Sequence, residues 1–152
     1  MKTFKAYTPN QAYLLPPNMS DWLPAGHLAL FISDVVDQLD LKLIYASYEE
    51  GGKRGQPPYH PAMMLKLLFY AYCTGKPSSR KIEKATWEEV SYRVLSADQH
   101  PDHDSISEFR KRHLKILSGL FLQVLLLCQK AGLVKLGHVA LDGTKVKANA
   151  SK

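Results

Sequence analysis

The stretch HPAMMLKLLFYAYCTGKP, residues 60–77, constrains the fold more than any other part of the chain. Pro61 suits the first turn of a helix, and Gly75 followed by Pro77 marks the end of one. Between these limits Lys66 is the one charged residue. A helix that is apolar on nearly every side packs against neighbours on several sides. The sequence therefore predicts a central helix that other helices surround.

Two helices are expected before this central one. Apolar side chains recur at helical spacing from Pro24 onward, at Leu28, Phe31, Ile32, Val35 and Leu39. Residues 41–48 continue as a second short helix or as a bent extension of the first. The first 20 residues contain three prolines and no sustained period, so residues 1–22 are expected to form an extended arm.

Two short helices are expected after the central one, over residues 78–85 and 87–95. Ser78 or Ser79 can cap the first, and Thr86 with Glu89 matches a capping box for the second. Their lengths and the tight turn between them are typical of a helix-turn-helix pair. In such a unit a helix enters the major groove of DNA with its first residues facing the bases.

A single long helix is expected beyond the polar loop SADQHPDHD. Ser105 with Glu108 forms another capping box, and the helix should run to about Lys130, with Gly132 as its left-handed stop. We expect His113 to lie in the core rather than to bind a ligand. A stripe of residues three and four apart would face the core: Ile106, Phe109, His113, Leu117, Leu120, Val124 and Leu127.

These patterns predict an all-α fold, a bundle of about six helices that contains a helix-turn-helix-like unit. One β-strand is expected at residues 138–142. A single strand cannot satisfy its own backbone groups, so it is either frayed or part of a sheet encoded beyond Lys152. The expected domains are an arm over 1–22, a helical domain over 23–134, and a strand and turn over 135–152.

Length and composition suit one soluble domain, with 152 residues of which 45% are hydrophobic. The two cysteines, Cys73 and Cys128, fall inside apolar helical runs, so we expect buried thiols and no disulfide framework. The start of the chain lacks the continuous apolar stretch of a signal peptide. No segment has the roughly 18 consecutive apolar residues of a membrane span. We therefore expect a cytoplasmic protein without a membrane partner.

Positive charge is unevenly distributed along the chain. Residues 1–50 hold three basic and six acidic residues, residues 51–100 hold eight and four, and residues 101–152 hold nine and four. The excess behind the net charge of +6 therefore lies beyond Gly51. This asymmetry favours a polyanionic partner, nucleic acid first and an anionic membrane surface second. A solvated basic surface is the alternative interpretation.

Cationic side chains gather on the helices of the expected DNA-binding unit. The stretch SEFRKRHLK would give the long helix a basic face near its start, while Ile106 and Phe109 point to the core. Contacts to phosphates position a protein on DNA, whereas contacts to base edges specify sequence. The DNA-binding candidates are Arg80, Lys81, Lys84, Arg110, Lys111, Arg112 and Lys115, with Lys53 and Arg54 of the loop GGKRG as weaker ones.

Two segments with acidic residues raise the question of a metal site. The loop DQHPDHD, residues 98–104, holds three aspartates and two histidines, but Pro101 interrupts it. Turn and capping chemistry explains this loop better, with Asp104 as a helix cap. Asp142 ends the expected strand, and one carboxylate is insufficient for two-metal phosphoryl transfer. From the residues alone, Asp142 is a turn residue and no cofactor is expected.

The order of several motifs resembles the N-terminal region of bacterial insertion-sequence DDE transposases, the class with an InsH-type N-terminal domain. The motifs are YHPAMMLKLL, SSRKIEKA, PDHDSISEFRKRH and ALDGTKVKANASK. The likeness runs from about Trp22 to Lys152. The combination is specific, whereas no single motif is.

The resemblance implies that the helical part binds double-stranded DNA at the terminal inverted repeats of the element. It also implies that Asp142 is the first acidic residue of the DDE triad, on the first strand of a ribonuclease H-like fold. In that family three carboxylates bind Mg²⁺ or Mn²⁺ and cut and join DNA strands. The second aspartate and the glutamate are missing from these 152 residues. A truncated, DNA-binding transposase is therefore expected, with a metal at Asp142 only in a complete enzyme.

Two other functions stay open. The chain could be one half of a split transposase that is active with a separate C-terminal fragment, which would pair with the strand at 138–142. It could instead be a helical stub that forms a homodimer through the apolar helices 61–74 and 114–128 and inhibits the full-length enzyme.

Overall fold

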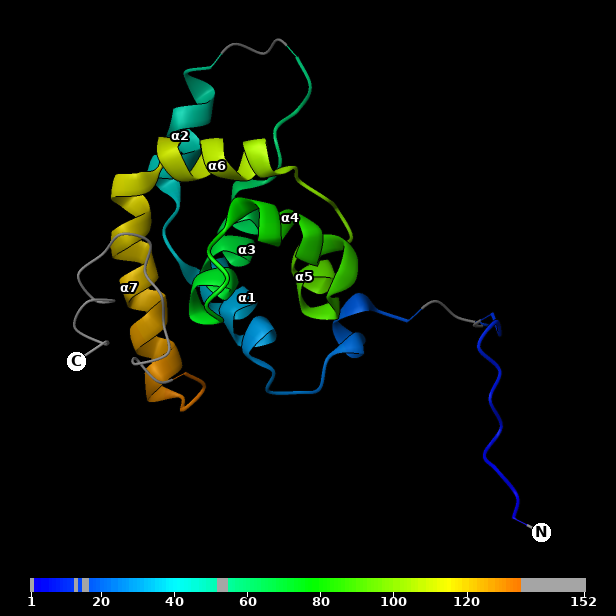
Figure 1. Ribbon diagram of the computed structural model, residues 1–152. Coiled ribbons are helices and arrows are strands. Elements are labelled where there is room, and N and C mark those ends of the chain that lie inside the picture. Colours follow the sequence, from blue (N-terminus) through cyan, green and yellow to red (C-terminus); the bar gives the residue numbers. More distant parts are fainter. Residues whose placement is uncertain (1, 13, 15–16, 52–54, 135–152) are drawn as a thin grey trace.

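Every regular element in the described part of the computed structural model is helical (Figure 1). The structure describes residues 2–12, 14, 17–51 and 55–134. A 3₁₀ turn, η1 (Met19–Trp22), precedes the α-helices. These are α1 (Leu28–Gln38), α2 (Lys42–Glu49), α3 (Pro61–Cys73), α4 (Ser79–Glu88), α5 (Val90–Leu95), α6 (His103–Arg112) and α7 (Leu114–Lys130). The all-α prediction is confirmed, and the strand expected at 138–142 lies outside the described residues.

The helix α3 occupies the centre of the bundle, as its composition predicts. Eleven of its thirteen residues are buried. Pro61 is its first residue, and Gly75 beyond its end has a φ of +75°, which favours glycine. Lys66 lies at its edge, where the ammonium reaches the Asp37 carboxylate of α1 at 2.8 Å. The prediction of a helix packed on several sides is confirmed.

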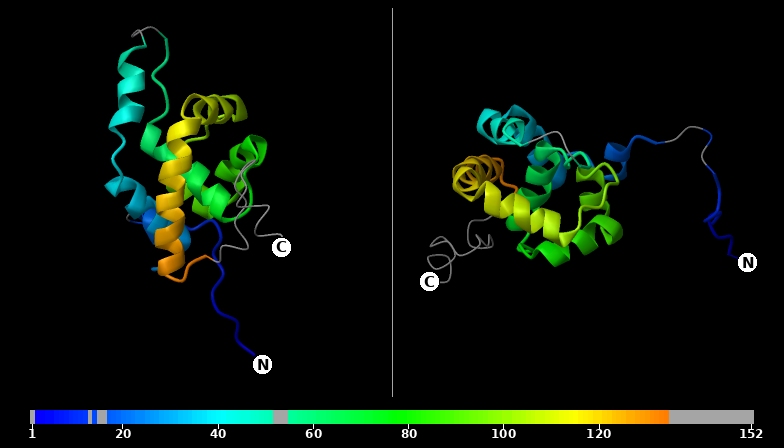
Figure 2. Two further views of the ribbon diagram at one scale, coloured as in Figure 1. Left: turned by 90° about the vertical axis from the view of Figure 1, so that its left-hand side faces the viewer. Right: turned by 90° about the horizontal axis from the view of Figure 1, so that it is seen from above.

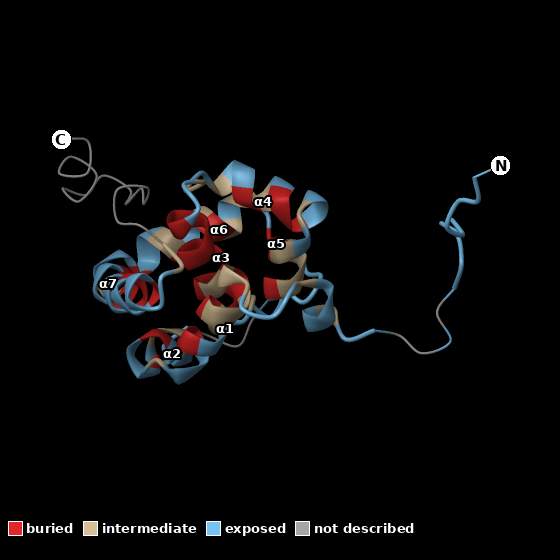
Figure 3. Ribbon diagram, turned by 90° about the horizontal axis from the view of Figure 1, so that it is seen from below, coloured by how far each residue is buried: buried red, intermediate tan, exposed pale blue. Residues whose placement is uncertain are grey.

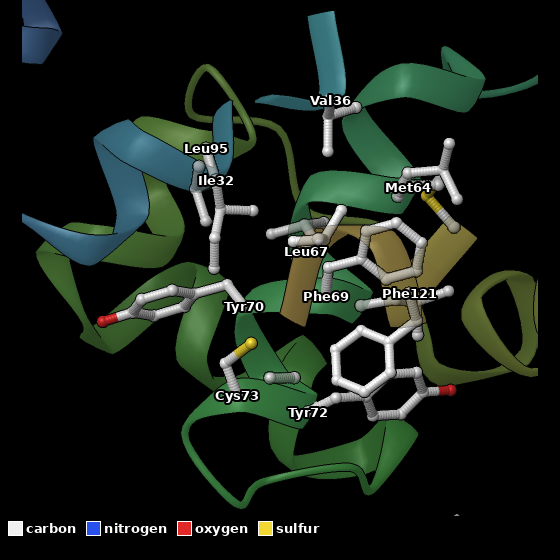
Figure 4. Packing of buried hydrophobic residues seen from close by; sticks show 14 of the residues in the cluster. Ile32, Val36, Met64, Leu67, Phe69, Tyr70, Tyr72, Cys73, Leu95 and Phe121 are labelled. Carbon is white, nitrogen blue, oxygen red and sulfur yellow. The ribbon is translucent and has the colours of Figure 1, made fainter. Parts of the chain in front are cut away.

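Aromatic side chains of α3 join it to the helices around it (Figure 4). The rings of Phe69 and Tyr72 lie 5.5 and 5.3 Å from the ring of Phe121 on α7. On another side, the Tyr70 ring meets the Tyr92 ring of α5 edge to face at 5.1 Å. Such pairs prefer offset or edge-to-face geometry, which adds to the free energy of simple burial. One continuous core therefore connects α3 with α5 and α7.

The two cysteines meet inside this core. Cys73 ends α3 and Cys128 lies on α7, and both are buried and free of disulfide bonds. A hydrogen bond between the two thiols, together with burial, raises the pKa of Cys73. Both side chains act as small apolar groups at the α3–α7 contact. The prediction of buried thiols is confirmed.

The long helix expected from Ser105 to about Lys130 is wrong, because the chain breaks at His113 into α6 and α7 (Figure 1). The two helices leave the junction in different directions, as the further views show (Figure 2). α6 packs against α4, whereas α7 packs against α1 and α3. The apolar spacing continues unchanged across the break, so periodicity conceals it. One residue of the expected stripe, Leu127, is exposed, and Cys128 is buried beside it.

Both expected capping boxes are also wrong. Asp102, rather than Ser105 or Asp104, caps α6, and its carboxylate accepts a hydrogen bond from the backbone N–H of Ser105 at 3.2 Å. Thr86 lies inside α4, where its hydroxyl donates to the Glu83 carbonyl at 2.6 Å. A threonine inside a helix commonly satisfies its hydroxyl in this way. Of the two serines expected as possible caps of the preceding helix start, Ser78 is the N-cap of α4 and Ser79 is its first residue.

The outer face of α7 carries apolar side chains that the rest of the described chain leaves exposed: Leu114, Leu122, Leu126 and Leu127. The helix is nevertheless not a membrane span, because no helix in the described part is long and apolar enough to cross a bilayer. Two helices were expected to supply a dimer surface, and one of them, α3, is buried in the core of the bundle. The dimer hypothesis therefore depends on α7 alone.

Acidification is expected to destabilise the α6–α7 junction. His113 is only 2% exposed, and burial first and the Arg112 charge second lower its pKa. The unfolded chain therefore binds more protons as pH falls through the unfolded pKa of about 6.5, so the free energy of unfolding decreases from pH 8 toward pH 5. Urea midpoints of the wild type and His113→Gln across this range measure the effect. The variant should show the flatter dependence, and equal slopes would contradict this account.

Candidate nucleic-acid interface

The helix α4 has an exposed side and a buried side (Figure 3). Three of the predicted cations are exposed on this helix. Its buried side faces the core through Ile82, Ala85 and Thr86. The exposed side carries Arg80, Lys81 and Lys84, which we name the α4 cationic face. Among the described residues neither Arg80 nor Lys81 forms an ion pair, and the Lys84 ammonium is 3.9 Å from the Glu88 carboxylate. This face therefore retains most of its charge for an external anion.

Contacts at both ends show that α6 runs antiparallel to α4. The Arg110 guanidinium near the end of α6 donates to the carbonyl of Pro77, just before α4, at 2.6 Å. At the other end, both the backbone N–H and the Nδ1–H of His103 donate to the Glu83 carboxylate, at 2.9 and 2.7 Å. These bonds lower the pKa of Glu83. The carboxylate also meets the positive end of the α6 dipole, so Glu83 links the two helices.

The three consecutive cations of α6 have different environments. The Arg110 side chain is half-buried, donates to the Pro77 carbonyl and lies 5.5 Å from the ring of Tyr72. Arg112 donates to the Ser47 carbonyl of α2 and lies 4.4 Å from the ring of Tyr48. Arg112 is nevertheless exposed, as are Lys111 between the two arginines and Lys115 on α7. Both arginines therefore connect helices of the bundle, and both lysines face solvent.

The two short helices of the expected helix-turn-helix unit are almost continuous. α4 and α5 are separated by Glu89 alone, and α5 has six residues. The one cation of α5, Arg93, donates to the Asp98 carboxylate at 2.9 Å and lies 5.8 Å from the ring of Trp22. This pairing leaves α5 without a free cation for DNA. The helix-turn-helix assignment stays a prediction, and of its two helices α4 carries the larger number of exposed cations.

The loop over residues 98–104 forms turn and capping contacts instead of a metal site. His103 bonds to Glu83 and Asp102 caps α6. The His100 ring stacks on Trp87, with centroids 3.4 Å apart and planes at 7°. A hydrogen bond from Arg93 lowers the pKa of Asp98, and hydrogen bonds from Ser105 lower the pKa of Asp102. The described residues contain no group of three histidine, cysteine, aspartate or glutamate side chains that could hold a metal ion.

Several predicted site residues lie outside the described part of the chain. These are Lys53, Arg54 and Asp142. Their assignment to DNA contact, and that of Asp142 to a catalytic metal, stays a prediction.

Trp87 and Glu83 did not emerge from the sequence as site residues. Trp87 lies three residues beyond Lys84, on the solvent side of α4, and is 62% exposed. The ring of His100 covers one face of its indole. The sequence did contain a signal for Trp87. It follows Lys84 by three residues and Arg80 by seven, which places all three on one side of a helix. The role of Glu83 depends on the neighbouring helix, which no local pattern indicates.

Comparison with known proteins gives a family for this chain. Residues 17–112, more than half of the chain, match the model of a family described as a transposase domain (DUF772). No curated protein and no solved structure matches. The matched range begins ahead of η1 and ends with the last residue of α6, so it contains α4 and its cationic face. The chain belongs to this transposase-domain family.

Proposed function

We propose that this chain binds double-stranded DNA at the ends of a transposable element, with the α4 cationic face on the phosphate backbone. The family supports a function in transposition. The observation that carries the proposal is the placement of Arg80, Lys81 and Lys84 on one exposed helix side. Cations that neutralise phosphates release counterions, and this release supplies much of the affinity for DNA.

The other predicted cations receive different roles in this proposal. Lys111 is exposed near the C-terminal end of α6, and Lys115 is exposed near the start of α7, so both can extend the contact along the backbone. Arg110 and Arg112 hold α6 against the rest of the bundle. Their main effect on DNA binding would therefore be indirect, through the orientation of α6 beside α4.

Binding to DNA is expected to depend steeply on salt and to favour the element's own ends. Fluorescence anisotropy would compare a duplex of one terminal repeat with a scrambled duplex of equal length and composition. If three cations contact phosphates, log affinity should fall against log salt with a slope of about −3 or steeper. The terminal repeat should bind at least about tenfold more tightly at equal salt.

The two parts of this experiment separate two claims. Equal affinity for both duplexes would contradict recognition of the terminal repeats and leave backbone binding in place. No measurable binding to either duplex at 50 mM salt would contradict DNA binding itself. A gel-shift titration with the same two duplexes checks the result without a fluorophore.

Strand cleavage is not part of the proposed function of these 152 residues. By the resemblance, Asp142 would hold Mg²⁺ or Mn²⁺ together with two further carboxylates in a complete enzyme. Pairing with a separate catalytic fragment stays an expectation of the same kind.

A further inference from the structure

Trp87 presents an open aromatic surface beside the α4 cationic face. Its side chain is 62% exposed although the parallel ring of His100 lies 3.4 Å away, centroid to centroid. One face of the indole is therefore covered, and the exposed area belongs to the other face and the ring edges. The contact with His100 therefore occupies only one of the two faces of the indole. A large aromatic surface left in water beside cations is typical of a binding site.

Polar contacts of the His100 side chain hold the Trp87–His100 stack in place. The Nδ1 atom of His100 lies 3.3 Å from the hydroxyl of Thr86, which is fully buried. Asp98, just before it, pairs with Arg93 at 2.9 Å and lies 3.9 Å from the Nε2 atom of His100. An aromatic ring whose support is fixed before binding loses little conformational freedom when a ligand stacks on it.

The position of Trp87 on α4 continues the row of cations. Residues three, four and seven apart lie on one side of a helix, so Arg80, Lys84 and Trp87 share a side. Three carboxylates lie near this end of α4. Those of Glu89 and Asp98 each pair with a cation at 2.9 Å, Lys76 and Arg93 respectively, and that of Glu88 lies 3.9 Å from the Lys84 ammonium. Cations that follow a phosphate backbone next to an aromatic ring are the arrangement by which proteins hold single-stranded nucleic acid.

We propose that Trp87, supported by His100, stacks on an unpaired nucleobase next to the duplex that the α4 cationic face contacts. This inference rests on the proposed DNA-binding function. It adds that the DNA ligand carries a single-stranded extension next to the duplex. Stacking requires only the π face of a base, so any of the four bases can occupy the site. One stacked base strengthens binding by about tenfold, within the range found for such contacts.

The test uses the full 152-residue chain and two labelled probes. One probe is a blunt 20-base-pair duplex, and the other is the same duplex with three unpaired thymidines at one 3′ end. Anisotropy titrations compare the wild type with Trp87→Ala, Trp87→Phe and Arg80→Ala/Lys81→Ala. The wild type should bind the tailed duplex about tenfold more tightly than the blunt one. Trp87→Ala should lose this advantage and bind the blunt duplex within about twofold of the wild type, because exposed substitutions perturb the fold little.

The two control variants isolate the contribution of the ring. Trp87→Phe keeps an aromatic face and should keep part of the advantage of the tail. Arg80→Ala/Lys81→Ala should weaken both probes by the same factor, so the advantage of the tail survives. In a Trp22→Phe background Trp87 is the one tryptophan, and its emission should be quenched by the tailed duplex and far less by the blunt one.

The possible failures are distinguishable. If the wild type binds both probes with equal affinity, or if Trp87→Ala keeps the full advantage of the tail, the stacking site is overturned and the DNA-binding function stands. If the wild type binds neither probe, both proposals are overturned.

Discussion

Neutralising the α4 cationic face is expected to remove most of the DNA affinity of this chain. In Arg80→Ala/Lys81→Ala/Lys84→Ala, three exposed cations disappear from one helix side. Each lost phosphate contact makes the slope of log affinity against log salt shallower by about 0.9, so the triple variant should lose about three from that slope. At 0.1 M salt the affinity for any duplex should fall on the order of 100-fold.

The fold should survive this change. All three side chains are exposed, and the one ion pair among them, Lys84 with Glu88, is long and exposed. Exposed pairs of this kind contribute about 0 to 1 kcal/mol. A thermal midpoint close to that of the wild type would confirm that the loss of affinity arises at the interface.

A matched variant separates the position of the charges from their number. Lys2→Ala/Lys42→Ala/Lys130→Ala also removes three exposed cations, from segments away from α4. This variant should lose little affinity at moderate salt, because screening limits the reach of exposed charges to about 10 Å at 0.1 M. If both triple variants lose the same affinity, net charge and not α4 carries the binding.

The elements that the sequence predicted well are those with local signals. Pro61, Gly75 and the lack of charge between them defined α3 without any knowledge of its neighbours. The serine pair Ser78 and Ser79 likewise identified the start of α4 to within one residue, since a capping oxygen and the N–H that it satisfies are only two or three residues apart. Signals of this kind need only the backbone geometry of one helix.

The break at His113 could not be predicted for a different reason. The apolar spacing continues through it, from Phe109 to His113 and Leu117, and periodicity reports only which side of a helix is buried. What separates α6 from α7 is the partner that each one packs against, and this depends on contacts far apart in the sequence. His113 lies at the turn, 4.7 Å from the ring of Phe109 and 5.8 Å from that of Tyr48, measured between centroids.

The same limit applies to the candidate interface. Seven cations near α4 and α6 are equivalent in the sequence, yet Arg110 and Arg112 contact the carbonyls of Pro77 and Ser47. These partners are 33 and 65 residues away along the chain. A planar guanidinium with several donors is suited to such contacts, whereas a lysine ammonium keeps its hydration at the surface. Composition identified the basic region. Tertiary structure is needed to separate Arg110 and Arg112, which contact carbonyls of distant segments, from the other cations.

Truncating the centre of the core should have the largest effect on stability. Phe69 of α3 is fully buried, and its ring lies 5.5 Å from that of Phe121 on α7 (Figure 4). Phe69→Ala removes most of a buried ring and leaves a cavity, so the free energy of unfolding should fall by about 3–5 kcal/mol. Domains of this size are stable by only about 5–15 kcal/mol. The variant should therefore unfold at much lower urea concentration than the wild type.

Leu122→Ala on α7 is the matched control, because it also shortens an apolar side chain but at an exposed position. Its free energy of unfolding should stay within about 0.5 kcal/mol of the wild type. Equal losses in both variants would mean that the outer face of α7 is covered in solution, and a small loss for Phe69→Ala would contradict the central place of α3.

Because α3 also contacts α4, the folded fraction of Phe69→Ala should set its DNA affinity. A stabilising osmolyte should then restore the folded fraction and the DNA affinity together. The core would then determine only the position of α4, whereas the affinity for DNA would come from the exposed side chains of the α4 cationic face.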